Sequence, residues 1–185
     1  MIYILIAAAL CLLAGFIWLY NLLVRQWQMV NNGWADIDVQ LKRRSDLVPR
    51  LVDVVRAYAS HERSLFEDIA EKRSLAEIAG EDPVRRAAAE GAFSRPVTRL
   101  LALAQAYPDL KASLNFSGLQ NELVDTENQI EMARRFYNGA VRELNTTVQS
   151  FPANLAAPMI GFSPRDYFEF ASGERETPHV RLPPT

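Results

Sequence analysis

The chain opens with a long apolar stretch that predicts a membrane-spanning helix. No charged side chain occurs before Arg25, and residues 2–24 are almost wholly apolar. As an α-helix, at about 1.5 Å per residue, this stretch is roughly 35 Å long, enough to cross a hydrocarbon core of ~30 Å. Trp18, Tyr20 and Trp27 cluster near its end, where aromatic rings favour the headgroup layer. We therefore expect a transmembrane anchor over residues 1–25.

The basic residues around this anchor predict its orientation. None precedes the apolar run, whereas Arg25, Lys42, Arg43 and Arg44 follow it, and cytoplasmic flanks carry the excess of Lys and Arg. A cleaved signal peptide would have a positively charged start and a shorter apolar core. We expect a retained single-pass anchor with the N-terminus outside and the body in the cytoplasm.

After the anchor, apolar residues recur at alternating spacings of three and four, which is typical of an amphipathic helix. The stripe consists of Trp27, Val30, Trp34, Ile37, Leu41, Val48, Leu51, Val55 and Tyr58, with Arg44 as its one charged position. It continues directly from the anchor and, less regularly, to Gly80, which predicts one long helix. Pro49 lacks the amide of a helical hydrogen bond, so the helix either restarts near Ser45 or kinks. We expect a kink, because the stripe keeps its phase across the proline.

Two further helices are expected downstream. Gly80 suits a helix end, Asp82 an N-cap and Pro83 the first position of a helix that runs to about Ala106. A second long apolar stripe extends from Phe116 to Phe151, and no alternating strand pattern occurs. The fold class is therefore all-α, with the anchor continuing into an elongated up-and-down helical bundle over residues 26–170. Residues 171–185 are polar and rich in proline, so we expect a disordered tail.

The composition and the motifs of the chain argue against several classes of function. The net charge of −2 and the lack of a basic stripe exclude the usual footprint of a nucleic-acid binder. The single cysteine, Cys11, lies within the anchor, so the chain has no intramolecular disulfide. His61 and Glu62 begin like a zinc motif of the HExxH type, but Leu65 stands where the second histidine is needed. We predict no metal site, no cofactor and no enzyme activity.

Three segments together carry a resemblance to a known family. They are NNGWADIDVQLKRRSDLVPRLVDVVRAYASHE at 31–62, AYPDLKASLNFSGLQNEL at 106–123 and TENQIEMARRFYNGAVRELNTTVQSFP at 126–152. With the anchor, they resemble the LemA family of bacterial membrane proteins. The resemblance implies a helical bundle on the cytoplasmic side of the bacterial inner membrane, without an established enzyme activity. It also implies membrane zinc proteases or TPM-domain proteins as partners.

The charged position in the first stripe is the main candidate for a polar site. A charge in a helix seam is costly unless it is paired. We hypothesise an interhelical network in which Arg44 or Asp46 joins Glu127 or Arg134 and fixes the alignment of the helices. The alternative is a solvated face with helix capping.

Two apolar groups are candidates for association. Two long stripes with only a short helix between them leave part of the first stripe without a partner in the chain, so Trp27, Trp34 and Ile37 are predicted to form a contact between copies, with Trp34 at its centre. Phe162, Tyr167 and Phe168 lie in a proline-broken segment after the last helix. They either cap the bundle or dock on a partner.

These features favour a non-enzymatic membrane-anchored scaffold or adaptor, forming a homo-oligomer in the lipid bilayer or binding another membrane protein. The alternative is a membrane-shaping or lipid-binding protein that acts by assembly on the bilayer. An enzyme with an unrecognised site is a third reading.

Overall fold

The computed structural model describes residues 1–169, which form helices and connecting segments with no strand among them. The helices are α1 (Ile2–Arg56), α2 (Arg63–Glu77), α3 (Pro83–Ala104), α4 (Pro108–Lys111), α5 (Leu114–Gln149), α6 (Ala153–Ala156) and the 3₁₀ helix η1 (Pro158–Ile160). The all-α fold class is confirmed. The tail predicted to be disordered, residues 171–185, lies outside the described residues.

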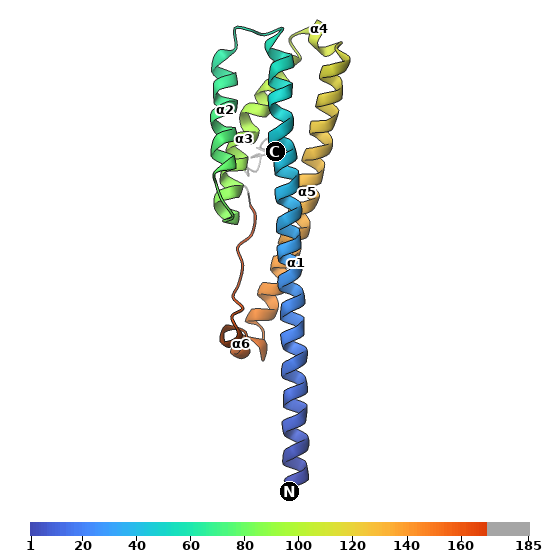
Figure 1. The fold of residues 1–185 in the computed structure, drawn as a ribbon, viewed down its shortest axis with the longest axis vertical. Coiled ribbons are helices and arrows are strands. Elements are labelled where there is room, and N and C mark those ends of the chain that lie inside the picture. Colours follow the sequence, from blue (N-terminus) through green and yellow to red (C-terminus); the bar gives the residue numbers. More distant parts are fainter. Residues whose placement is uncertain (170–185) are drawn as a thin grey trace, which may run out of the picture.

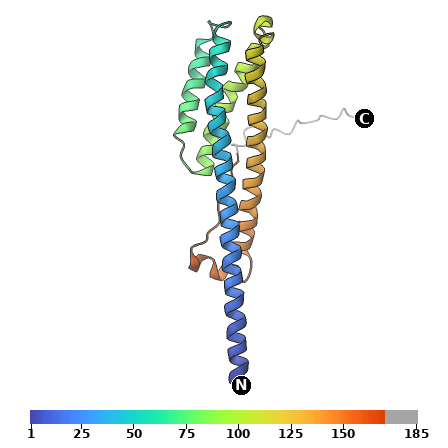
Figure 2. The ribbon, with the colours of Figure 1, turned by 45° about the vertical axis from the view of Figure 1, so that its right-hand side comes forward.

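The body is an elongated bundle built along α1. Helix α5 runs antiparallel to α1, and α2 and α3 pack beside the half of α1 that is far from its N-terminus (Figure 1). Helix α6 lies next to α1 at the opposite end of the body, and the rest of α1 projects beyond it without a partner (Figures 1 and 2). We call the α2–α3 end distal and the α6 end proximal.

Pro49 does not interrupt α1. The helix continues from Ile2 to Arg56 with Pro49 inside it, so it does not restart near Ser45, and the kink stays a prediction. Val48 and Leu51, on either side of the proline, are fully buried in the bundle. Packing on both sides therefore keeps the helix continuous although one backbone hydrogen bond is missing.

The first helix ends earlier than the stripe suggests. The chain reverses over residues 57–62 and begins a separate helix, α2, so the expectation of one helix as far as Gly80 is wrong. The turn contains neither proline nor glycine, and Glu62 caps α2 without a side-chain hydrogen bond. Ala59 is the buried residue of this turn. Leu65, Phe66 and Ile69 of α2 are buried in the hydrophobic core at the distal end. The reversal therefore follows from burial, since local sequence would permit a continuous helix.

The start of α3 follows the predicted signals. Asp82 accepts a hydrogen bond of 2.9 Å from the Arg85 amide, and Pro83 occupies the first turn of α3. Ser113 caps α5, the long helix predicted from the second stripe, by accepting from the amide of Phe116 at 3.5 Å. Each cap satisfies an amide that the helix itself leaves without a partner.

The buried side chains form two clusters. The distal core joins the end of α1 to α2, α3 and the start of α5, and includes Val48, Leu51, Val55, Phe66, Phe93, Leu100, Phe116 and Leu123. The proximal core lies mainly between α1 and α5, and includes Leu23, Val30, Ile37, Leu41, Ile130, Tyr137, Val141, Leu144 and Phe168. A Cβ atom on Gly33 would lie 3.0 Å from the Cα atom of Tyr137, so glycine at this position allows α1 and α5 to approach closely.

Candidate functional site: a buried arginine cluster and a C-terminal strap

Arg44 lies at the junction of the two cores, one turn from Leu41 on one side and from Val48 on the other. Its side chain is fully buried, which is rare for an arginine unless the charge is paired. One terminal nitrogen, Nη1, donates to Ser94 Oγ at 2.8 Å and to Glu127 at 3.1 Å. The other, Nη2, donates to the carboxylate and the main-chain carbonyl of Glu90. The guanidinium group thus joins α1 to α3 and α5.

Glu90 extends this cluster back to α1. Its side chain is almost fully buried, and its second carboxylate oxygen accepts from Arg86 Nε at 3.1 Å. Arg86 in turn donates to Asp38 of α1 at 3.2 Å. The arginine cluster, which we define as Asp38, Arg44, Arg86, Glu90, Ser94 and Glu127, therefore alternates positive and negative charges across three helices. Alternation of this kind compensates the cost of taking each charge out of water.

The chemistry of this cluster is that of a structural tie. Ser94, its one hydroxyl group, accepts from Arg44 and donates to the main-chain carbonyl of Glu90 at 3.0 Å. A serine nucleophile needs a neighbouring base that accepts its proton, and here the proton points to a carbonyl instead. The guanidinium group also lies 5.3 Å from the centre of the Phe93 ring, a cation–π contact that adds to the tie.

The residue next to Arg44 ties α1 to α2. Ser45 is buried and donates to Glu77 at 2.8 Å, while it accepts from Arg73 Nε at 2.9 Å. Arg73 and Glu77 form an ion pair at 3.0 Å along α2. Adjacent residues of α1 thus hold all three of the other long helices through polar contacts.

The second constellation is an extended segment, residues 162–169, which we call the strap. It follows η1, where Gly161 has a φ of 85°, a conformation that suits glycine, and it runs back along the body toward the distal end (Figure 1). Phe168 is fully buried, with its ring 5.9 Å from that of Trp34 and 5.6 Å from the guanidinium carbon of Arg134. The strap is thereby fixed to both α1 and α5.

Two asparagines of α5 hold the backbone of the strap as a neighbouring strand would. Asn138 donates to the Phe168 carbonyl at 3.1 Å and accepts from its amide at 2.9 Å. Asn145 makes the same pair of bonds to Arg165, at 2.9 and 2.8 Å. Seven helical residues and three extended residues both measure about 10 Å, so the two spacings match. An extended backbone has no internal hydrogen bonds, and these side chains supply them.

Tyr137 completes the attachment. Its hydroxyl group donates to the main-chain carbonyl of Asp166 at 2.9 Å, and its ring lies 5.7 Å from that of Trp34. Burial raises the pKa of Tyr137 to about 12, against a smaller opposing effect of Arg165. The phenol is therefore protonated, and able to donate, over the whole physiological pH range.

Comparisons with known proteins match most of this chain to one family. The profile of the LemA family matches residues 33–182, which include α2, α3, α5 and the strap. The chain belongs to the LemA family. It is 23% identical over 189 residues to each of the magnetosome proteins MamQ 1 and MamQ 2 of Paramagnetospirillum magneticum, covering 89% of this chain and 70% of theirs. Magnetosome protein MamQ of Magnetospirillum gryphiswaldense is 24% identical over 174 residues, covering 80% and 64%.

In this LemA-family protein, only some of the residues predicted to form the polar network belong to the arginine cluster. Arg44 and Glu127 are in contact, as described above. Asp46 is exposed and pairs with Lys42 at 3.0 Å, so its inclusion is corrected. Arg134 stacks on Phe168, and its pKa is lowered mainly by burial. Glu90 and Arg86 were not identified from the sequence as members of the cluster. They lie on α3, whose alanine-rich sequence has no clear apolar stripe from which a charged position would stand out.

The predicted association surface is covered within the chain. Ile37 is fully buried, and Trp34 contacts Tyr137 and Phe168 of the same chain. Trp27 is half-buried beside the proximal core. The expectation that this stripe lacks a partner is therefore wrong, because α5 and the strap cover it.

The predicted docking segment is this same strap. Phe168 is buried, Phe162 packs against the proximal core, and Tyr167 stays partly exposed. Of the two readings, capping of the bundle describes what the strap does within the chain. The signal that could have indicated it is the spacing of Asn138 and Asn145, two helical turns apart on one face of α5.

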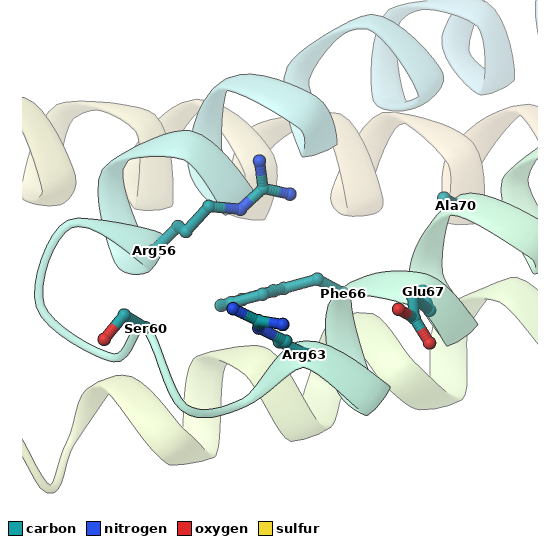
Figure 3. A pocket seen from close by; sticks show the side chains of 6 residues that line it. All are labelled: Arg56, Ser60, Arg63, Phe66, Glu67 and Ala70. Atoms are coloured by element: carbon teal, nitrogen blue, oxygen red, sulfur yellow. The ribbon is translucent and has the colours of Figure 1, made fainter.

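Open hollows occur on the surface of the body. One, of about 420 Å³, lies between α1 and α5 and is lined by Asp36, Val39, Gln40, Gln129, Met132, Ala133 and Phe136. We call it the α1–α5 groove. Another, of about 470 Å³, lies at the distal end, where Arg56 covers the ring of Phe66 at 5.2 Å (Figure 3). Within residues 1–169, no group of three or more His, Cys, Asp or Glu side chains is placed to hold a metal ion.

Helix α1 is the one helix of the described chain that has the length and apolar composition of a membrane span. No residue of its most apolar 18-residue segment is buried within the protein. Because the span and the body share this helix, no flexible linker separates them.

Proposed function

We propose that this LemA-family protein is a non-enzymatic, membrane-anchored scaffold whose rigid body assembles with further copies through the α1–α5 groove. The observation that carries the proposal is the continuity of α1 from the apolar span into a body held by the arginine cluster. A body without a hinge presents the same face at a fixed height above the bilayer. Surfaces with that property suit assembly between neighbours in one membrane.

The groove exposes apolar side chains of the kind that assembly requires. Val39, Met132 and Phe136 line it and are 62%, 53% and 45% exposed. Confinement to the membrane raises the effective concentration of copies, so a small apolar contact suffices for association. Parallel anchors place the grooves of two copies at equal height, so a two-fold axis along the membrane normal brings them together. The orientation proposed is N-terminus outside and body in the cytoplasm, at the bacterial inner membrane.

The adaptor form of this proposal places another membrane protein in the same groove. The resemblance to LemA proteins suggests a membrane zinc protease or a TPM-domain protein for that role. Membrane shaping is a third form, in which assembled copies deform the bilayer without a protein partner.

Photo-crosslinking in intact cells tests the proposal. A photoreactive amino acid at Met132 is compared with the same residue at Val84, whose exposure of 55% matches the 53% of Met132. We expect a product of twice the chain mass from Met132 and not from Val84. A product containing one other membrane protein would replace the scaffold by the adaptor. Equal yields from both positions, or none from either, would overturn the groove as the assembly face.

Adding purified protein to vesicles of phosphatidylcholine and phosphatidylglycerol distinguishes membrane shaping from the scaffold function. Tubulation with protein and lipid alone would favour membrane shaping, whereas unchanged vesicles favour a scaffold.

A further inference from the structure

The base of the body is free of charge over a long stretch. Between Glu143 and Arg165 the sequence contains no charged residue, although charged residues make up 23% of the chain. This base segment, residues 144–164, comprises the end of α5, α6, η1 and the start of the strap. It is the second long uncharged stretch of the chain after the one that contains the span.

The two uncharged stretches lie side by side. The ring of Phe162 contacts that of Tyr20 on α1 edge to face, with centroids 6.3 Å apart. Leu19 of α1 packs against the same cluster as Ile160. Figures 1 and 2 both show α6 next to α1 at the point where the helix leaves the body. The base segment therefore shares the height of Leu19 and Tyr20 along the helix.

That height lies at the membrane boundary. Arg25 is the first charge on α1, and Tyr20 is five residues before it, about 7.5 Å deeper along the helix. The headgroup layer on each side of a bilayer is about 5 to 7 Å thick. If Arg25 lies at the aqueous edge of the headgroups, Tyr20 and the base segment reach the edge of the hydrocarbon core.

The base segment exposes large apolar side chains in this position. Phe151, Leu155 and Met159 are 80%, 65% and 86% exposed, whereas Ala153 and Ala157 are buried against the body. Within α6, Leu155 follows Ala153 by two positions, a rotation of about 200°, so the exposed and the buried side chain lie on opposite faces of this helix. An exposed apolar face of this kind can be buried at the boundary between headgroups and acyl chains, as the apolar face of an interfacial helix is.

We infer that the base segment binds the lipid surface of the bilayer that α1 crosses, with Phe151, Leu155 and Met159 inserted at the boundary between headgroups and acyl chains. This inference rests on the membrane anchoring of the proposed function and adds a second lipid contact to it. Two contacts, a span and a surface element beside it, fix the tilt of the body, which a single span leaves free. Presentation of the α1–α5 groove at a constant angle follows from this.

Depth-dependent fluorescence quenching tests the inference on the full chain. In a Cys11→Ala background, single cysteines carry a small fluorophore at Met159, at Leu114 or at Leu12. Leu114 is the matched control, because its exposure of 86% equals that of Met159 and it lies at the distal end. The protein is placed in nanodiscs of phosphatidylcholine and phosphatidylglycerol, with nitroxide lipids labelled near the headgroup or at the end of the acyl chain.

We expect the label at Met159 to be quenched mainly by the headgroup-proximal nitroxide, the label at Leu12 mainly by the deep nitroxide, and the label at Leu114 by neither. A repeat with Phe151→Cys checks that no single substitution decides the result. If Leu12 is quenched and Met159 and Phe151 behave like Leu114, the base stands clear of the lipid, and the inference is overturned while anchoring holds. If Leu12 is not quenched, anchoring itself fails and the inference falls with it.

Discussion

The distal and proximal halves of the body are built on the same two helices but are completed in different ways. In the distal half, α2 and α3 cover the apolar faces of α1 and α5. In the proximal half, the strap and α6 cover them instead, and α1 and α5 approach closely at Gly33. A helix satisfies its own backbone hydrogen bonds, whereas an extended strap does not. The proximal half therefore depends on a few side chains of α5 in a way that the distal half does not.

The arginine cluster stands between these halves. Arg44 is flanked by the proximal core at Leu41 and by the distal core at Val48, and its partners lie on α3 and α5. Loss of this tie should affect both halves, while loss of a strap contact should affect the proximal half alone. The four experiments that follow test this difference.

The largest effect is expected for Arg44→Ala. The substitution leaves the buried Glu90 carboxylate without its partner on α1, and breaking a buried pair in this way costs about 3 to 5 kcal/mol of unfolding free energy. Chemical denaturation of the protein in nanodiscs, followed by circular dichroism, measures it. Arg43→Ala is the control, since Arg43 is exposed and should cost less than about 0.5 kcal/mol. Equal stability of both variants would show that the cluster does not tie the helices.

A smaller and local effect is expected for Phe168→Ala. Burying a phenylalanine contributes about 3 to 5 kcal/mol when the whole fold depends on it, but here release of the strap limits the loss. Hydrogen exchange should show loss of protection at the amide of residue 168, while the amides of α2 and α3 retain theirs. Tyr167→Ala, at a partly exposed neighbour, is the comparison and should leave the strap in place. Loss of protection throughout α2 and α3 would mean that the halves are one cooperative unit.

A smaller effect than that of Phe168→Ala is expected for Asn138→Ala, which should weaken the attachment of the strap to α5. It removes both hydrogen bonds to Phe168 and leaves a backbone amide and carbonyl to find water, at a cost of about 1 to 3 kcal/mol in strap opening. The same exchange measurement reports it. Asn121→Ala on the same helix is a suitable control, because Asn121 is exposed. The interpretation fails if both asparagine variants exchange alike.

The smallest effect is expected at Tyr137. Tyr137→Phe removes the hydrogen bond to Asp166 and should cost about 1 kcal/mol. The folded-state pKa of about 12 lies above the ordinary value of 10.0, so this contribution is complete below pH 10 and is lost as the pH rises toward 12. Titration of phenolate absorbance should show one late-ionising tyrosine in the wild type that is missing in the variant. Identical titration curves would contradict the assigned pKa.

Most of the long-range plan could be predicted from local sequence. Helix periodicity and capping are local properties, so each such pattern predicts the structure of the segment that contains it. Examples are the apolar run of α1, the stripe of α5 and the caps Asp82 and Ser113. Arg44 also stood out, since a charge within an apolar stripe must find a partner. These features depend on residues close together in the chain, which is why a single sequence displays them.

What the sequence determined by itself is thus the all-α class, the apolar span and the identity of the residue that needs a buried counter-charge. Tertiary structure decided the rest. It reversed the chain at residues 57–62, kept α1 helical through Pro49, placed Glu90 beside Arg44 while Asp46 stayed exposed, and covered Trp34 with Phe168. Each of these outcomes is set by burial of one segment against another far away in the chain, and such burial outweighs the modest local preferences that sequence patterns express.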